Sequence, residues 1–239
     1  MSDLDSFVDA YGADFAYSFD NDIMLNWYPS RIIECHQPVE RTLELGVGHG
    51  YTCAKFAKHF DHYEVIDGSK AVIERFHTQF PDAGLTLHEG YFETFTPRQP
   101  FDLIVMGFVL EHVEDPAVIL KRYRDFLTPG GKVVVGVPNA ESLHRRFGHA
   151  AGLLEDMDAL GPGDHALGHL RSFNVASLDA LLEDCGYRVT SREGIFLKPL
   201  MTDQLKSLNL NDDILAGMCA VGRDYPELSA GLLFEAEAK

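Results

Sequence analysis

The sequence predicts an α/β fold built on a doubly wound, mostly parallel sheet of seven strands. Short apolar runs typical of buried strands alternate with segments of helical periodicity from residue 41 to residue 137. A cluster of glycines, Gly46, Gly48 and Gly50, follows the first of these runs, at the edge where such sheets bind ligands. With 239 residues, 46% of them hydrophobic, the chain is long enough to bury a core of this kind.

The first five strands are predicted at Arg41–Leu45, Tyr63–Asp67, Leu85–His88, Phe101–Met106 and Lys132–Val137. Helices are predicted between them at Tyr51–Phe60, Lys70–Gln79 and Ala117–Phe126. The run Thr128–Gly131 holds a proline and two glycines and is predicted as a turn before the fifth strand. This alternation indicates a parallel sheet with helices on both faces.

The regular pattern stops after Pro138. Residues 139–172 are rich in glycine and histidine, and we expect an insertion after strand five, over the carboxyl edge of the sheet. A helix at Val175–Cys185, a strand at Tyr187–Arg192 and an antiparallel strand near Gly231–Ala236 then complete the seven strands.

The beginning of the chain is rich in aromatic residues. Phe7, Tyr11 and Phe15 recur at the spacing of one helix face, which predicts an N-terminal helical lid. We therefore expect a single domain, 1–239, with a lid segment at 1–38, a ligand-binding core at 39–138, an insertion at 139–172 and the rest of the sheet at 173–239.

Charge and cysteine content exclude several classes of protein. The formal net charge is −17, from 20 basic and 37 acidic residues, and such a surface repels nucleic acid and anionic membranes. The four cysteines are scattered without a CxxC pair, which favours reduced thiols over a zinc site or disulfides. With no targeting or membrane-spanning pattern, a cytoplasmic protein is expected.

The glycine loop, Leu43–Gly50, lies between the first strand and the first helix and reads GxGxG after an acid, Glu44. The dinucleotide form GxGxxG would need a glycine at position 51, where Tyr51 stands. A second acid, Asp67, ends the second strand about 20 residues further on and is suited to accept hydrogen bonds from ribose hydroxyls. Asp67 or Ser69 could instead cap the following helix.

Two further motifs carry a family resemblance. The stretch 101–116, FDLIVMGFVLEHVEDP, and the turn LTPGGKV at 127–133 resemble motifs of class I, seven-stranded S-adenosylmethionine-dependent methyltransferases, as does the glycine loop. The resemblance is strong over residues 40–140. HLRSF at 169–173 and DCGY at 184–187 place it nearest the branch of ubiquinone, natural-product and sugar methyltransferases acting on small molecules.

The resemblance implies a Rossmann-like methyltransferase fold that binds S-adenosylmethionine and releases S-adenosylhomocysteine. It assigns Glu44 to the cationic ammonium of the cofactor and Asp67 to the ribose. It implies that the adenine lies near Tyr91, which replaces the acid usual in the family. The remaining residues expected in the cofactor site are Tyr17, Gly46, Gly48, Gly50, Gly68, Ser69, Gly90, Phe92, Gly107, Phe108 and His112.

No metal is expected, because Phe108 stands where ubiquinone-type enzymes have an acid three residues before the Glu-His pair. A histidine near the methyl acceptor could remove its proton. We rank His169 first and His165 second, because they immediately precede the helix after the insertion, and His112 third. The alternative for His165 and His169 is a solvent-exposed loop histidine, and the alternative for Glu111 and His112 is a structural edge of the cofactor pocket.

The expected reaction is methyl transfer to a small-molecule acceptor, with oxygen favoured over nitrogen and nitrogen over carbon. A nicotinamide oxidoreductase and a non-catalytic binding protein remain alternatives, although the GxGxG spacing disfavours the first and the intact acids disfavour the second. No nucleic-acid or membrane partner is expected, and a homodimer stays open.

Overall fold

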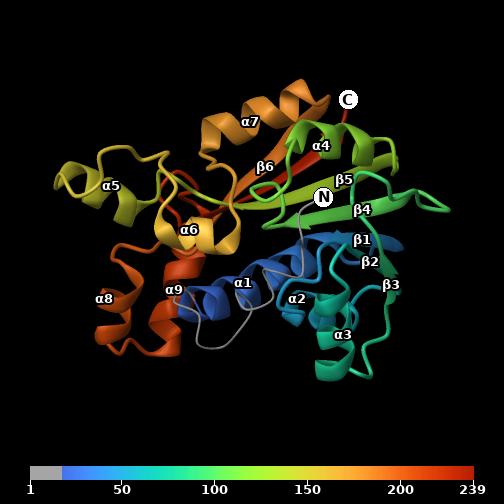
Figure 1. Ribbon diagram of the computed structural model, residues 1–239, viewed down its shortest axis with the longest axis horizontal. Coiled ribbons are helices and arrows are strands. Elements are labelled where there is room, and N and C mark those ends of the chain that lie inside the picture. Colours follow the sequence, from blue (N-terminus) through green and yellow to red (C-terminus); the bar gives the residue numbers. More distant parts are fainter. Residues whose placement is uncertain (1–17) are drawn as a thin grey trace.

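The computed structural model describes residues 18–239, and its seven strands form one sheet in the order β3-β2-β1-β4-β5-β7-β6 (Figure 1). The strands from β1 to β5 run parallel, whereas β7 pairs antiparallel with β5 and β6. The doubly wound, mostly parallel seven-stranded prediction is therefore confirmed. The predicted helix face at Phe7, Tyr11 and Phe15, and the cofactor residue Tyr17, lie outside the described residues.

The strands are β1 Arg41–Leu45, β2 His62–Asp67, β3 Thr86–Glu89, β4 Phe101–Gly107, β5 Leu127–Pro138, β6 Tyr187–Ile195 and β7 Gly231–Ala238. The helices are α1 Ser18–His36, α2 Tyr51–Phe56, α3 Lys70–Gln79, α4 Pro116–Arg124, α5 Leu143–Ala150, α6 Pro162–Leu167, α7 Val175–Asp184, α8 Thr202–Ser207 and α9 Asp212–Arg223.

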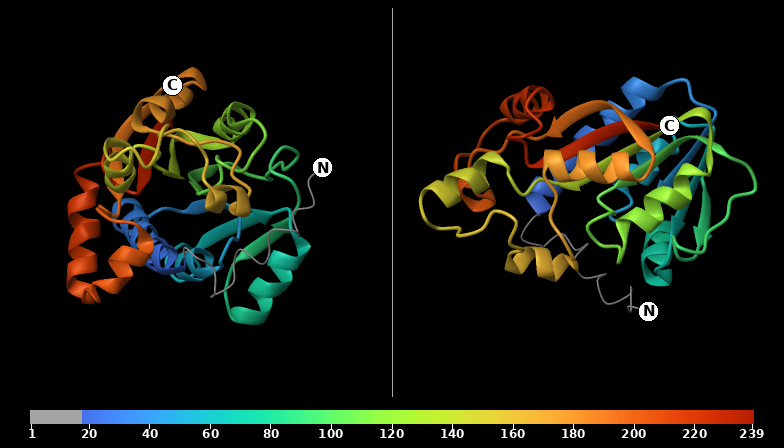
Figure 2. Two further views of the ribbon diagram at one scale, coloured as in Figure 1. Left: turned by 60° about the vertical axis from the view of Figure 1, so that its left-hand side comes forward. Right: turned by 90° about the horizontal axis from the view of Figure 1, so that it is seen from above.

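Helices cover both faces of the sheet, as the views of Figure 2 show. Leu43 and Leu45 of β1 belong to the apolar cluster formed with α4 and α7. Val65 of β2 and Val105 of β4 belong to the cluster on the other face, formed with α1, α2, α3 and α9. Because successive side chains of a strand alternate between faces, the central strands are buried on both sides.

The sequence misplaced some boundaries and left some elements unassigned. The predicted turn at 128–131 lies inside β5, where pairing with β4 shifts register and Gly130 has a φ of 82°. The insertion contains α5 and α6. Helix α1, which has Pro29 in its interior, lies within the predicted N-terminal lid segment, 1–38, although its own bounds were not predicted. Among the helices of residues 18–239, none combines the length and apolar character that crossing a membrane requires.

Candidate functional site

A cavity of about 1060 Å³ lies at the carboxyl ends of the central strands. Its wall includes the glycine loop after β1, the end of β2, the loop after β4 and the insertion. Pockets for small molecules usually measure about 300–1,000 Å³, so this cavity is at the upper end of that range.

The glycine loop forms the floor of the cavity at Gly46 and Gly48, which have φ angles of 82° and 52°. Residues other than glycine rarely adopt such positive φ angles. Among residues 18–239, a Cβ placed on Gly48 would meet nothing within 4 Å. The third glycine, Gly50, is the left-handed N-cap of α2 and is not part of the wall, and a Cβ placed on it would collide with Phe76 and Phe80.

Glu44 lies in β1 beneath this loop and is only 2% exposed. Its carboxylate accepts hydrogen bonds from the Tyr63 hydroxyl and from Cys53 Sγ, the latter at 3.2 Å. Burial raises the pKa of Glu44 to about 7, and these two hydrogen bonds oppose the rise. A cation in the cavity would favour the ionised form.

Asp67 ends β2 at the cavity wall and is held by two backbone groups. Its Oδ2 accepts a hydrogen bond from Val47 N at 2.7 Å, and its Oδ1 accepts one from Ser69 N at 2.8 Å. The side-chain cap of α3 is Ser69, whose Oγ accepts from Val72 N. Asp67 also lines the cavity, where its carboxylate would meet a ligand.

The other predicted cofactor residues divide into two groups. Those that line the cavity are Gly68, Ser69, Phe92, Gly107, Phe108 and His112. Gly90 and Tyr91 do not line it, and their contact with a cofactor stays a prediction. Phe108 has a φ of 57°, unusual for a bulky residue, and such strain is concentrated at functional sites.

The insertion brings His169 to the loop after β4. His169 Nδ1 lies 3.0 Å from Asp164 Oδ1, and its ring lies 4.8 Å from that of His112 in an edge-to-face arrangement. Burial alone would raise the pKa of Asp164, but hydrogen bonds from His169 and from the Gly161 N–H outweigh this effect and lower the pKa. Asp164 is therefore ionised at neutral pH. An ionised Asp164 fixes the proton on Nδ1 and leaves Nε2 of His169 able to accept one.

Glu111 is a site residue that the sequence analysis left as a structural edge. It is 1% exposed and lines the cavity, and neither carboxylate oxygen has a hydrogen-bond partner within residues 18–239. Burial raises the pKa of Glu111 to about 7, and the nearby His169 opposes the rise. Burial also lowers the pKa of His112 to about 4, so His112 is neutral at pH 7.

A clamp made by Arg171 fixes this arrangement. Its guanidinium donates to the carbonyl oxygens of Leu110, Val113 and Glu114, and Leu170 N donates to Glu111 O at 2.8 Å. The HLRSF motif therefore ties the end of the insertion to the Glu-His loop.

The remaining predicted catalytic histidine, His165, is exposed on α6 and does not line the cavity. Glu111, His112 and His169 bring ligand atoms within 4.8 Å of one another, a set that could hold a metal ion. The expected absence of a metal stays a prediction.

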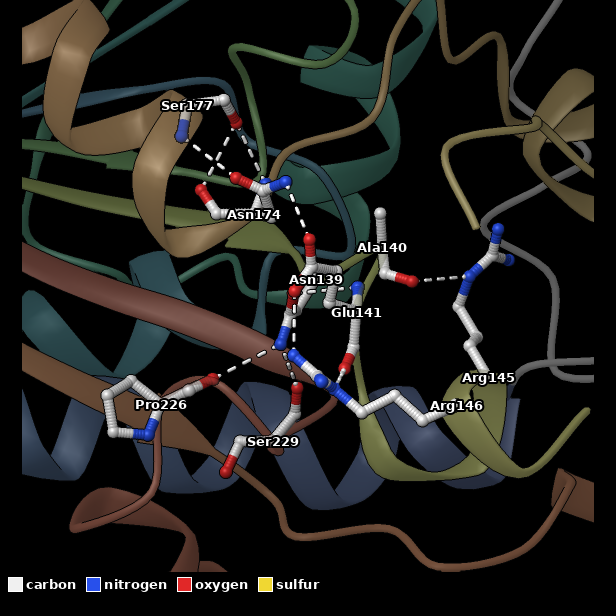
Figure 3. Close-up of polar contacts among 9 residues, drawn as sticks. All are labelled: Asn139, Ala140, Glu141, Arg145, Arg146, Asn174, Ser177, Pro226 and Ser229. Carbon is white, nitrogen blue, oxygen red and sulfur yellow. Dashed lines mark hydrogen bonds and ion pairs between the residues drawn. The ribbon is translucent and has the colours of Figure 1, made fainter. Parts of the chain in front are cut away.

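The start of the insertion is anchored as firmly as its end (Figure 3). Asn139 Nδ2 donates to the carbonyl oxygens of Pro226 and Ser229 at 3.1 and 2.9 Å, and Arg145 Nε donates to Ala140 O at 2.9 Å. These bonds hold the chain where it leaves β5, so that α5 lies across the cavity.

Several lining residues were not predicted as site residues from the sequence. They are Asp20, Asn21, Met24, Leu25 and Tyr28 of α1, and Lys198 after β6. No local motif marks them, because they meet only when distant segments fold together. Gly107 is connected with one of these residues, Tyr28. A Cβ at position 107 would lie 2.5 Å from the Tyr28 hydroxyl, so a glycine is required there.

The geometry can be compared with known proteins. A protein family described as "Methyltransferase domain" matches residues 25–192. Trans-aconitate 2-methyltransferase of Methylobacterium radiotolerans is 34% identical over 130 residues, which cover 53% of this chain and 46% of that protein. Ubiquinone biosynthesis O-methyltransferase of Aeromonas salmonicida is 27% identical over 180 residues, which cover 73% of each.

The fold is also found among solved structures. The N-methyltransferase NodS from Bradyrhizobium japonicum WM9, in complex with S-adenosylhomocysteine, aligns with a TM-score of 0.56 at 17% identity over 94% of this chain and 89% of that one. The match to the trans-aconitate enzyme spans about half of its length. Because the family match extends over more than half of the chain, this protein belongs to the methyltransferase domain family.

Proposed function

We propose that the protein transfers the methyl group of S-adenosylmethionine to a hydroxyl oxygen of a small molecule. One observation carries the proposal. A single cavity contains the glycine loop, Asp67 and the His169–Asp164 pair, which are the parts that cofactor binding and proton removal require. The names of the relatives, an O-methyltransferase of ubiquinone biosynthesis and a methyltransferase of trans-aconitate, support a small-molecule acceptor.

The residues at the glycine loop fit the cofactor. The space over Gly48 accommodates a ligand close to the backbone, Asp67 lines the cavity with a carboxylate suited to ribose hydroxyls, and Glu44 offers negative charge to an ammonium group. When bound, the cofactor supplies a methyl group on a cationic sulfur, which becomes a neutral thioether after transfer.

The chain itself has to orient the acceptor and take its proton. His169 Nε2 accepts the hydroxyl proton as the oxygen forms its bond to the methyl carbon, and Asp164 stabilises the imidazolium through Nδ1–H. The insertion forms one wall of the site. Because the sulfonium is already a good leaving group, alignment of oxygen, carbon and sulfur supplies much of the acceleration.

The proposal is tested by incubating the full chain with S-adenosylmethionine and a panel of small alcohols, phenols, amines and carboxylic acids. Release of S-adenosylhomocysteine is measured, and the methylated product is identified by mass spectrometry. We expect turnover with a hydroxyl-bearing acceptor. Turnover with amines alone would replace oxygen by nitrogen, whereas failure to bind S-adenosylhomocysteine at all would refute the methyltransferase assignment.

A further inference from the structure

A second polar cluster lies in the same cavity and has no part in the chemistry above. It joins Asp20 of α1, His144 of α5 and Lys198, which follows β6, and all three line the cavity. Lys198 Nζ donates to Asp20 Oδ2 at 2.5 Å and to Thr202 Oγ1 at 2.8 Å, and Thr202 Oγ1 donates to the same Asp20 oxygen at 2.6 Å. Three segments far apart in the sequence therefore meet here.

The two charged groups are almost completely removed from water, with Asp20 at 7% and Lys198 at 3% exposure. Removing both members of an ion pair from water is unfavourable, and apolar residues of the same volume often stabilise a protein at least as well. A buried pair in a cavity wall is therefore weak evidence for a purely stabilising role, and its ligand-binding capacity has to be considered.

The pair is incompletely satisfied. Within the described chain Asp20 Oδ1 has no hydrogen-bond partner, although it is buried. An ammonium group has three N–H donors, and the contacts of Lys198 use two of them. His144 adds no charge, because burial, and next the nearby Lys198, lower its pKa to about 3. The cluster thus offers one acceptor and one donor, with the two charges cancelling.

This combination selects a ligand group by charge. A hydroxyl or a primary amide can donate to Asp20 and accept from Lys198. An ammonium group would donate to Asp20 but be repelled by Lys198, and a carboxylate would meet the opposite conflict. In a site of low dielectric, such a like-charge contact costs more than a hydrogen bond returns.

The walls that adjoin the cluster are apolar. Met24 and Leu25 of α1, Phe147 of α5, Leu153 of the insertion and Leu200 after β6 all line the cavity. Phe147 and Leu153 are 54% and 85% exposed, so both side chains are accessible to an apolar ligand in the cavity.

We propose that Asp20 and Lys198 form the anchoring subsite for the methyl acceptor, and that the acceptor is a neutral molecule with an apolar body and a hydroxyl or amide group bound by this pair. The assignment rests on the proposed function only in calling the ligand the acceptor. The Asp20–Lys198 pair is a specificity determinant and takes no part in proton transfer.

Three probes with one apolar body and different heads test the proposal: 3-phenylpropan-1-ol, 3-phenylpropylamine and 3-phenylpropionate. Their binding to the full chain, with S-adenosylhomocysteine in excess, is measured by calorimetry or ligand-observed NMR. We expect the alcohol to bind about tenfold or more tightly than either charged probe. Binding of the amine or the acid as tight as that of the alcohol, or binding of none of the three, would overturn the proposal.

Reciprocal variants separate selection from a structural role. Lys198→Met leaves the Asp20 charge alone and should shift the preference toward the amine, whereas Asp20→Asn should shift it toward the acid. A pair that only fastens α1 to the loop after β6 would weaken all three probes alike, and that result contradicts the proposal. The control variants, Arg192→Met and Asp179→Asn, break an ion pair outside the cavity wall and should keep the wild-type order.

Failure of this proposal is distinguishable from failure of the proposed function. Binding of S-adenosylhomocysteine is measured first, without any probe. If it binds and the alcohol is not preferred, the subsite assignment is wrong while the cofactor site stands. If it does not bind, the methyltransferase proposal fails, and the order of the probes on the free chain still decides whether the pair selects by charge.

Discussion

At the scale of single residues, the two acids that the sequence places near the glycine loop, Glu44 and Asp67, have different surroundings. Asp67 stays in contact with the cavity and is held by backbone N–H groups, whereas Glu44 is buried against Tyr63 and Cys53. The sequence could predict that both acids lie near the glycine loop, because their positions at strand ends are local properties. It could not predict Glu111 as an unpartnered carboxylate, because that depends on what the insertion brings beside it.

The ribose assignment predicts the effect of Asp67→Asn. The variant keeps an acceptor but loses charge-assisted bonds worth roughly 1.5–3 kcal/mol, so affinity for S-adenosylhomocysteine should fall about ten- to a hundredfold. Calorimetry measures the dissociation constant, and Asp179→Asn, on α7, serves as the control. An unchanged constant would leave Asp67 as a residue that only orders the loop.

The base assignment predicts that His169→Ala keeps cofactor affinity and lowers turnover by about a hundredfold or more, the usual share of general-base catalysis. Higher pH should partly restore the rate, because an ionised acceptor does not need the base. Asp164→Asn should give a smaller loss and a changed pH profile, since the imidazolium loses its counter-charge. Near-wild-type turnover of His169→Ala would exclude it and direct attention to His112.

At the scale of elements, the insertion contains helices and forms part of the cavity wall, and is not an irregular loop. Its two ends are fixed by Asn139 and Arg171, and α5 and α6 lie between them. The sequence indicated the place of the insertion through its glycines and histidines. It did not indicate the helices, because short helices such as α6 depend on tertiary contacts more than on intrinsic propensity.

The Arg171 clamp predicts that Arg171→Met destabilises the protein and the site together. Three carbonyl oxygens lose a charged donor, and hydrogen bonds of this kind are worth about 1.5–3 kcal/mol each, with part recovered by water. We expect the free energy of unfolding, measured in urea, to fall by about 2–4 kcal/mol. The control is Arg188→Met, because Arg188 is exposed and its ion pair with Glu237 is expected to contribute little. Equal effects of the two variants would refute the clamp.

At the scale of the whole molecule, the sheet collects residues from distant parts of the chain at one edge. The order of the strands places the ends of β1, β2 and β4 together, and the insertion and α1 close over them (Figure 1). The alternation of strands and helices made this architecture predictable. The subsite formed by Asp20 and Lys198 was not predictable, because these residues lie 178 positions apart in segments that carry no motif.

Burial of Glu44 makes a prediction about global stability. Its pKa in the folded protein, about 7, is raised above the ordinary 4.5, so the folded state keeps a proton that the unfolded chain loses. The contribution of this bound proton to the free energy of unfolding is therefore fully present below about pH 4.5 and is lost as the pH rises through 7. Relative to wild type, Glu44→Gln should gain up to about 2–3 kcal/mol between pH 5 and pH 8.

Urea unfolding of the cofactor-free proteins across this range measures that difference, and the histidines common to both proteins cancel. Glu227→Gln, at an exposed position, is the matched control. A difference that is flat with pH would show that Glu44 does not hold a raised pKa.

The measurement that tests the central claim most directly is calorimetric titration of S-adenosylhomocysteine into wild type and Gly48→Asn, with NADH as the comparison ligand. Asparagine tolerates the left-handed backbone of Gly48, and its Cβ would meet no atom of residues 18–239 within 4 Å, so the side chain can project into the cavity. Gly130→Asn is the matched control, because Gly130 has a φ of 82°, a Cβ there also meets none of these residues within 4 Å, and Gly130 does not line the cavity. The account predicts that wild type and Gly130→Asn bind one S-adenosylhomocysteine, that Gly48→Asn loses this binding and that NADH does not bind. Binding of S-adenosylhomocysteine to Gly48→Asn as tightly as to wild type, or binding of NADH in its place, would contradict it.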